Sequence, residues 1–152
     1  MRAYPFYRTT TDAFNIWAPS VLSAALRVWL AIIFFKSGLT KIASWDTTLA
    51  LFEYEYQVPL LSPVLAAYAG TAVELIVPIM LIMGLFTPFS AAVLFVFNAV
   101  AAISYPDISE AGMKEHMYWG ILLTVPLALG GGRFSIDYLW QRLRLRRTGH
   151  VA

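Results

Sequence analysis

Residues 63–86 read PVLAAYAGTAVELIVPIMLIMGLF, and this stretch decides the fold because its only charged residue is Glu74. A helix needs about 20 apolar residues to cross the roughly 30 Å hydrocarbon core of a bilayer. Three further apolar stretches lie at about 20–39, 88–104 and 114–130. We therefore predict an all-α, polytopic membrane protein, a four-transmembrane-helix bundle that forms a single membrane domain.

The composition supports a bilayer as the solvent. Hydrophobic residues make up 59% of the chain and charged residues 13%, whereas about 25% of the residues of a soluble domain are charged. There is no cysteine, which excludes disulfides, iron–sulfur clusters and thiol redox chemistry. No phosphate loop or dinucleotide fingerprint occurs. We expect no nucleic-acid partner, because the basic run at 142–147 directly follows a membrane segment.

The residues that flank the spans predict the orientation. Residues 135–147 are expected to form a short amphipathic helix on the membrane surface. On one side of the membrane, the flanks of the spans carry Lys41 and Lys114. The other side carries only arginines: Arg2, Arg8, Arg133, Arg142, Arg144, Arg146 and Arg147. Because basic residues favour the cytoplasmic side, we predict a bacterial inner-membrane protein with both termini in the cytoplasm.

Ionisable residues inside the predicted spans are candidates for a binding site, because a charge in hydrocarbon costs about 3 kcal/mol or more. Counting 1.5 Å per residue from the ends of the spans places Arg27 about 10 Å and Glu74 about 14 Å from the inner face. Asn98 comes out near the same depth. We predict that Arg27 and Glu74 form an ion pair in an intramembrane polar layer with Asn98. The alternative is that the pair only fixes helix packing.

Three further residues are secondary candidates. Lys36 lies near the outer interface, where its ammonium group can reach water, and Lys41 is expected at that interface as well. His116 shares one helical face with Met113 and Met117. Thioethers and imidazole can bind copper(I), but we predict an interfacial histidine with packing methionines and no metal site.

Three motifs resemble those of a known family. The first is R-x6-F-x3-G-x2-K, from Arg27 to Lys41, and the second is E-L-x2-P-x5-G-L-F-T, from Glu74 to Thr87. The third is G-G-G-R-F-S-I-D at residues 130–137. Together they resemble the DoxX family of small four-helix bacterial membrane proteins. The family is named for its similarity to the membrane part of a thiosulfate–quinone oxidoreductase, and some members are linked to oxidative-stress complexes. The resemblance therefore implies quinone-linked redox work.

We expect an accessory or quinone-linked subunit of a redox or stress-response system. Quinone would be the cofactor, held in the polar layer, with Tyr68, Phe95 and Phe97 as ring contacts. Because the sequence has no flavin or metal motif, electrons would come from a soluble or membrane redox partner. One alternative is a membrane scaffold that recruits a soluble partner. Another is a small-solute carrier, which would need a homo-oligomer because four helices leave little interior volume.

Overall fold

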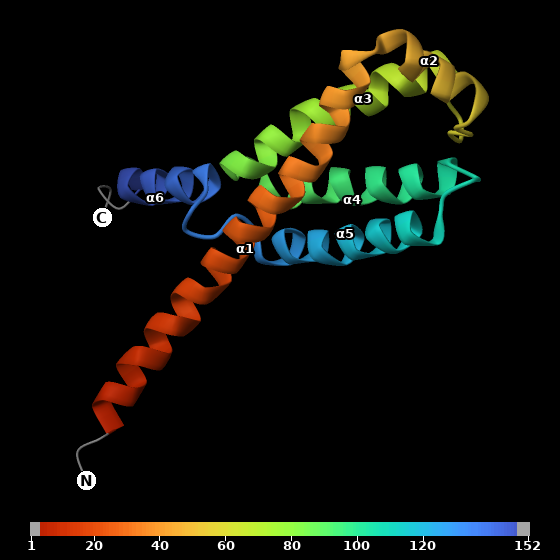
Figure 1. The fold of residues 1–152 in the computed structure, drawn as a ribbon. Helices are drawn as coiled ribbons and strands as arrows, with labels where there is room; N and C mark the ends of the chain where they lie inside the picture. Colours follow the sequence, from red (N-terminus) through yellow and green to blue (C-terminus); the bar gives the residue numbers. More distant parts are fainter. Residues whose placement is uncertain (1–3, 149–152) are drawn as a thin grey trace.

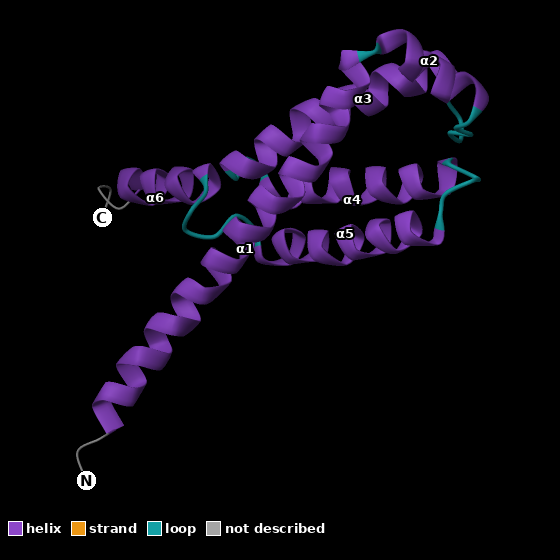
Figure 2. Ribbon diagram, viewed as in Figure 1, coloured by secondary structure: helices purple, strands orange, loops and turns teal. Residues whose placement is uncertain are grey.

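The structure is a computed structural model that describes residues 4–148, and all the regular elements in this range are helices (Figures 1 and 2). The prediction of an all-α protein is confirmed. The helices are α1 (Tyr4–Ala43), α2 (Trp45–Tyr54), α3 (Pro63–Met83), α4 (Thr87–Ser104), α5 (Glu110–Leu129) and α6 (Ile136–Thr148).

Three of the described helices are long and apolar enough to cross a membrane. They are the Trp17–Ala43 part of α1, together with α3 and α4. They correspond to the first three predicted spans. Helix α5 occupies the place of the fourth, but its first turns carry Glu110, Lys114 and Glu115, which lower its mean hydropathy below that of the other three.

The four long helices form one bundle. Helix α1 crosses the others obliquely and packs against α3 and α5, while α4 packs between α3 and α5 (Figure 1). Leu30, Phe34, Leu81, Leu94 and Leu123 form the buried core. The first part of α1 extends beyond the bundle, at the end where α6 lies and opposite α2 (Figure 1).

Two boundaries differ from the prediction. Helix α1 begins at Tyr4 rather than near residue 20, because a helix can continue outside the apolar stretch that marks a membrane span. The stretch from residue 41 to 62, which lies between the first two predicted spans, contains α2. This helix buries Thr48 and Phe52, and Phe52 clusters with alanines of α3. A helix of this length is too short to be found by an apolar window of membrane-spanning length.

A tight turn joins α3 and α4 into a hairpin. Helix α3 ends at Met83 and is capped by Gly84, whose φ of 66° is left-handed. The Gly84 amide donates to the Leu81 carbonyl and the Leu85 amide donates to the Met80 carbonyl, which is a common way to end a helix. Helix α4 then begins at Thr87, with a proline in its first turn.

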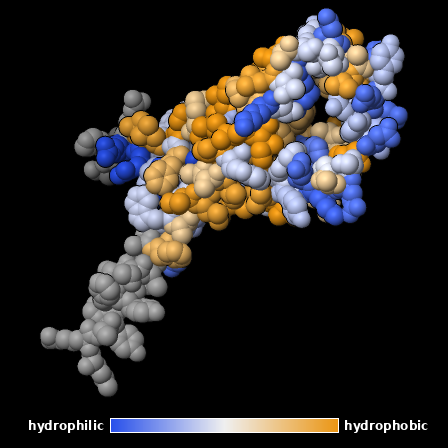
Figure 3. Space-filling view, viewed as in Figure 1, coloured by the Kyte–Doolittle hydropathy of each residue, from blue (hydrophilic) through white to orange (hydrophobic). Residues whose placement is uncertain are grey.

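The surface has an apolar middle and more polar ends. Figure 3 shows hydrophobic residues along the bundle, whereas hydrophilic residues gather over α2 and the connection between α4 and α5. Large apolar side chains that face outward include Ile76, Ile79, Val96 and Ile121. Such a surface is suited to contact with lipid chains, so the lipid bilayer is the medium around the bundle.

Candidate functional site

Arg27 lies where α3 ends and the segment before α6 begins. Its side chain is buried, with the residue 2% exposed. Nη2 donates to the Phe134 carbonyl at 2.6 Å, and Nη1 donates to the Leu81 carbonyl at 3.4 Å. The last carbonyls of a helix lack partners within the helix and carry partial negative charge. Arg27 therefore joins α1 to the end of α3 and to the chain that leads into α6.

Asp137 closes the same region from the other side. Its carboxylate accepts from the amides of Phe86 and Thr87, each at 2.8 Å, and from the Thr87 hydroxyl at 2.8 Å. A carboxylate at a helix N-terminus satisfies free amides and favours the helix dipole. We call Arg27, Gly84, Thr87 and residues 130–137 the clasp. Parts of all three sequence motifs meet there.

The predicted ion pair between Arg27 and Glu74 is wrong. Glu74 instead pairs with Lys41, whose Nζ lies 2.7 Å from Oε2. The error comes from counting depth from residue 20, although α1 begins at Tyr4 and crosses the bundle obliquely. Arg27 consequently lies level with Leu81, which is about two turns beyond Glu74 along α3. Its role in the structure is to bind backbone carbonyls.

Lys41, Glu74 and Ser37 form a hydrogen-bonded cluster between α1 and α3. Lys41 Nζ donates to Glu74 Oε1 at 2.8 Å and to Ser37 Oγ at 3.1 Å, and Ser37 Oγ donates to Oε1 at 3.0 Å. The side chain of Glu74 is 5% exposed and that of Lys41 is 18% exposed. Because a charge buried alone is costly, the two side chains depend on each other.

Gly38 allows the close approach that places this cluster. A Cβ atom at Gly38 would lie 2.8 Å from Leu75 Cδ2 and 3.0 Å from Glu74 Cβ. Small residues let membrane helices pack closely. The glycine of the first motif thus sets the distance between α1 and α3.

Asn98 and His116 link α4 to α5. The Asn98 amide nitrogen donates to the His116 carbonyl at 2.8 Å, and its amide oxygen lies 2.8 Å from His116 Nδ1. Because an amide oxygen only accepts, Nδ1 carries the proton, and Nε2 of the neutral ring is left as an acceptor. Asn98 is buried, so it acts on the site by orienting His116.

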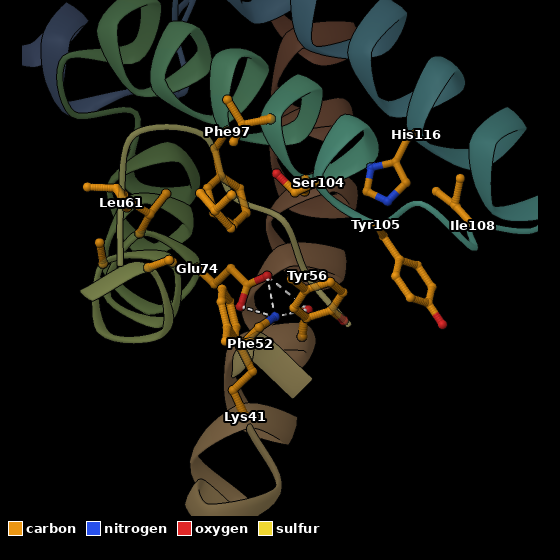
Figure 4. Close-up of a pocket in the computed structure, with 18 residues that line it drawn as sticks. Lys41, Phe52, Tyr56, Leu61, Glu74, Phe97, Ser104, Tyr105, Ile108 and His116 are labelled. Carbon is orange, nitrogen blue, oxygen red and sulfur yellow. Dashed lines mark hydrogen bonds and ion pairs between the residues drawn. The ribbon is translucent and has the colours of Figure 1, made fainter. Parts of the chain in front are cut away.

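A cavity of about 260 Å³ lies beside these groups, and we call it the apolar cavity (Figure 4). Lys41 and Glu74 point toward each other on one wall, with Tyr56 next to them (Figure 4). His116 and Ser104 contribute further polar atoms. Most of the wall is apolar or aromatic and includes Phe52, Val58, Leu61, Val73, Phe97, Val100, Ala101 and Ile108.

Aromatic residues close one side of the apolar cavity. The Tyr56 ring meets those of Phe52 and Tyr105 at centroid distances of 4.9 and 5.2 Å. The Gln57 amide donates to the Ser104 carbonyl at 2.7 Å and ties this connection to the end of α4. Burial raises the pKa of the Tyr56 phenol, as do Tyr105, Glu55 and Glu74. The phenol therefore stays protonated at neutral pH and can donate a hydrogen bond.

The structure brings some of the predicted site residues together and separates others. Glu74, Lys41 and His116 line the apolar cavity, and Asn98 holds His116. Arg27 lies in the clasp, and Lys36 is exposed on α1. Among the predicted ring contacts, Phe97 lines the apolar cavity. The other two do not line it, since Tyr68 packs on Trp45 and Phe95 is partly exposed.

Sequence reasoning missed Ser37, Phe52 and Tyr56. Ser37 lies four residues before Lys41 and so shares its helical face, which is a signal that could have identified it. Phe52 and Tyr56 reach the cavity because α2 folds back onto α3. The packing of α2 on α3 is not marked in the sequence by an apolar stretch long enough to span a membrane.

The bundle and its buried charged cluster define an all-helical integral membrane protein. The sequence profile of the DoxX family matches residues 22–106, more than half of the chain. The protein therefore belongs to the DoxX family, and the predicted membership is confirmed. It is also 30% identical over 127 residues to an uncharacterized protein of Haemophilus influenzae, covering 78% of this chain and 82% of that protein. No solved structure matches the chain.

Proposed function

We propose that the protein is a four-span protein of the bacterial cytoplasmic membrane, with α5 as the fourth span and both termini in the cytoplasm. Helix α5 packs along α4, and its charged residues Glu110, Lys114 and Glu115 all lie in its first two turns. In a four-span arrangement they would lie at the membrane surface, at the end of the bundle that carries α2 (Figure 1). Helix α6 would then lie on the cytoplasmic face, where its arginines favour anionic lipid.

We further propose that the apolar cavity binds the ring of a lipid-soluble quinone, and that the protein is an accessory subunit of a redox system. The observation that carries this proposal is a buried Lys41–Glu74 pair on the wall of an aromatic-lined cavity. Ligand sites are mostly apolar, with a few polar groups that fix orientation. The cavity is large enough for a ring, while a long isoprenoid tail would stay among lipid chains.

The polar groups of the cavity suit both redox forms of such a ring. Lys41 Nζ and the Tyr56 phenol can donate to a quinone carbonyl, and Glu74 and His116 Nε2 can accept from the hydroxyl of a quinol. The Ser104 hydroxyl lines the cavity and is buried without a hydrogen-bond partner. Because a buried polar atom without a partner costs free energy, a ligand oxygen there would be favourable.

The electrons would come from a partner. The sequence has no flavin or metal motif, so this chain can hold and orient the quinone ring and exchange protons with it, but a separate redox protein would deliver the electrons. A redox partner, either soluble or in the membrane, stays a prediction. The homo-oligomer expected for a carrier stays a prediction as well.

The test is to purify the full chain from bacterial membranes in mild detergent and extract it with organic solvent. We expect chromatography with redox difference spectra to find a quinone at about one per chain, as a single site requires. Ala101→Leu adds volume to the cavity wall and should lose the quinone. The matched control is Ala99→Leu, on an exposed position of α4, which should keep it. Absence of quinone from the wild type, or equal content in both variants, would overturn the proposal and favour the scaffold or the carrier.

A further inference from the structure

A second cavity lies where α1 meets α2. It has a volume of about 300 Å³, and its wall carries the hydroxyls of Ser37, Thr40, Ser44, Thr47 and Thr48. We call it the hydroxyl-lined cavity. It adjoins α2, over which hydrophilic residues gather (Figure 3). Four of these hydroxyl side chains, those of Thr40, Ser44, Thr47 and Thr48, do not line the apolar cavity.

The two cavities meet at the charged cluster. Ser37, Lys41, Phe52 and Tyr56 line both of them, whereas Glu74 lines only the apolar cavity. Lys41 is also the more exposed member of the pair. The ion pair therefore lies at the junction of the two cavities: Lys41 reaches both, whereas Glu74 reaches only the apolar cavity.

The hydroxyl-lined cavity suits water. Water fills a cavity that is roomy and offers two to four polar partners for each molecule. The Thr48 hydroxyl donates to the Lys41 carbonyl at 2.9 Å, and the hydroxyls of Ser44 and Thr47 lie 2.6 Å apart. Each hydroxyl has one donor and two acceptor sites, so these contacts leave sites to spare for water.

We propose that the hydroxyl-lined cavity is the water route by which the Lys41–Glu74 pair exchanges protons with the aqueous phase beside α2. Uptake of one proton from water converts the ion pair into an ammonium beside a neutral carboxyl group. Loss of that proton, to water or to a ligand in the apolar cavity, restores the pair. The step moves only a proton and needs no oxidant. The other titratable groups on the two cavity walls are Tyr56, Tyr105 and His116.

Delivery of protons to a ligand in the apolar cavity rests on the proposed function. Proton exchange between water and the Lys41–Glu74 pair does not. This separation allows a test without ligand. The lysines of the chain are Lys36, Lys41 and Lys114, so labelling with ¹⁵N-lysine gives a simple spectrum. Exchange of the Lys41 ammonium hydrogens with water can then be measured by NMR on the full chain in nanodiscs, with Lys36 and Lys114 as internal references.

We expect Thr47→Leu to slow exchange at Lys41 by about tenfold, because apolar packing then replaces a polar path. Thr47→Ser keeps the hydroxyl and should leave the exchange rate unchanged. Ala101→Leu fills the apolar cavity and should leave it unchanged as well. Equal rates in Thr47→Leu and the wild type, or equal slowing by Ala101→Leu, would overturn the proposal.

A second experiment blocks the hydroxyl-lined cavity only after the protein has folded. The chain has no cysteine, so Thr47→Cys can be folded first and then labelled with a charged methanethiosulfonate reagent that does not cross membranes. We expect labelling to proceed and exchange at Lys41 to slow afterwards, while Ala101→Cys stays unlabelled. Unchanged exchange after full labelling of Thr47→Cys would refute the water route. Quinone content, measured separately, reports on the proposed function alone.

Discussion

Lys41 Nζ lies 2.7 Å from Glu74 Oε2, across the contact between α1 and α3. This contact ties the apolar cavity to helix packing, because the approach at Gly38 that brings α1 against Leu75 also brings the two charges together. The pair is at once a packing feature and the most polar part of the cavity wall.

Lys41→Met and Glu74→Gln should each lower stability. Removing one member of a buried pair leaves the other charge without a partner, at a cost of about 3–5 kcal/mol. The double variant should recover much of this loss, because no charge is then left alone. Thermal unfolding in detergent measures all three variants. Additive losses in the double-mutant cycle would show that the two side chains act independently.

Arg27→Met should destabilise the protein without coupling to Glu74. The Phe134 carbonyl would lose its Arg27 donor, while the Leu81 carbonyl would keep only the Gly84 amide. A buried unpaired acceptor costs about 1–3 kcal/mol. Arg27→Lys should not restore stability, because an ammonium group lacks the planar fork of a guanidinium. Lys36→Met, at an exposed position of α1, serves as the control. Rescue of Arg27→Met by Glu74→Gln would contradict the separation of the two sites.

Gly84→Ala should lower the melting temperature. Gly84 has a φ of 66°, and a Cβ atom there would collide with Arg27 Nη1 and lie 2.8 Å from Ser135 Cα. Left-handed backbone alone costs an alanine about 1–2 kcal/mol, and the clash would add to this. Gly70→Ala is the matched control in the same helix, since its nearest neighbour would be Phe97 at 3.6 Å. Gly70→Ala should be neutral or stabilising by up to about 1 kcal/mol. Equal melting temperatures for the two variants would argue against a tight clasp.

The orientation can be tested with reporters. A fluorescent protein that folds only in the cytoplasm should be active when fused after Ala152, because basic residues favour that side. In the cysteine-free chain, Asp107→Cys lies in the connection between α4 and α5 and should react with an impermeant thiol reagent in intact spheroplasts. An inactive fusion together with a protected Asp107→Cys would reverse the topology.

The sequence predicted the long apolar helices better than the contacts between helices. The expected span at 88–104 and helix α4 (Thr87–Ser104) differ by one residue at the start, because proline and a polar loop mark its ends. Helix α2 could not be found in this way, since its burial depends on a fold-back onto α3. The partner of Glu74 was missed because estimating a residue's depth from its distance along the sequence assumes that every helix stands upright in the membrane. The tilt of α1 moves Arg27 to the end of α3 and brings Lys41 level with Glu74.

The clasp also sets an order of assembly. Arg27 and its acceptor Phe134 are separated by 107 positions in the chain, so at about 5–20 residues per second the acceptor is synthesised roughly 5–20 seconds after the arginine. During that interval α1 carries a guanidinium without this partner. The clasp can therefore close only after all four long helices have been synthesised, and a chain released before residue 134 leaves Arg27 without its Phe134 acceptor.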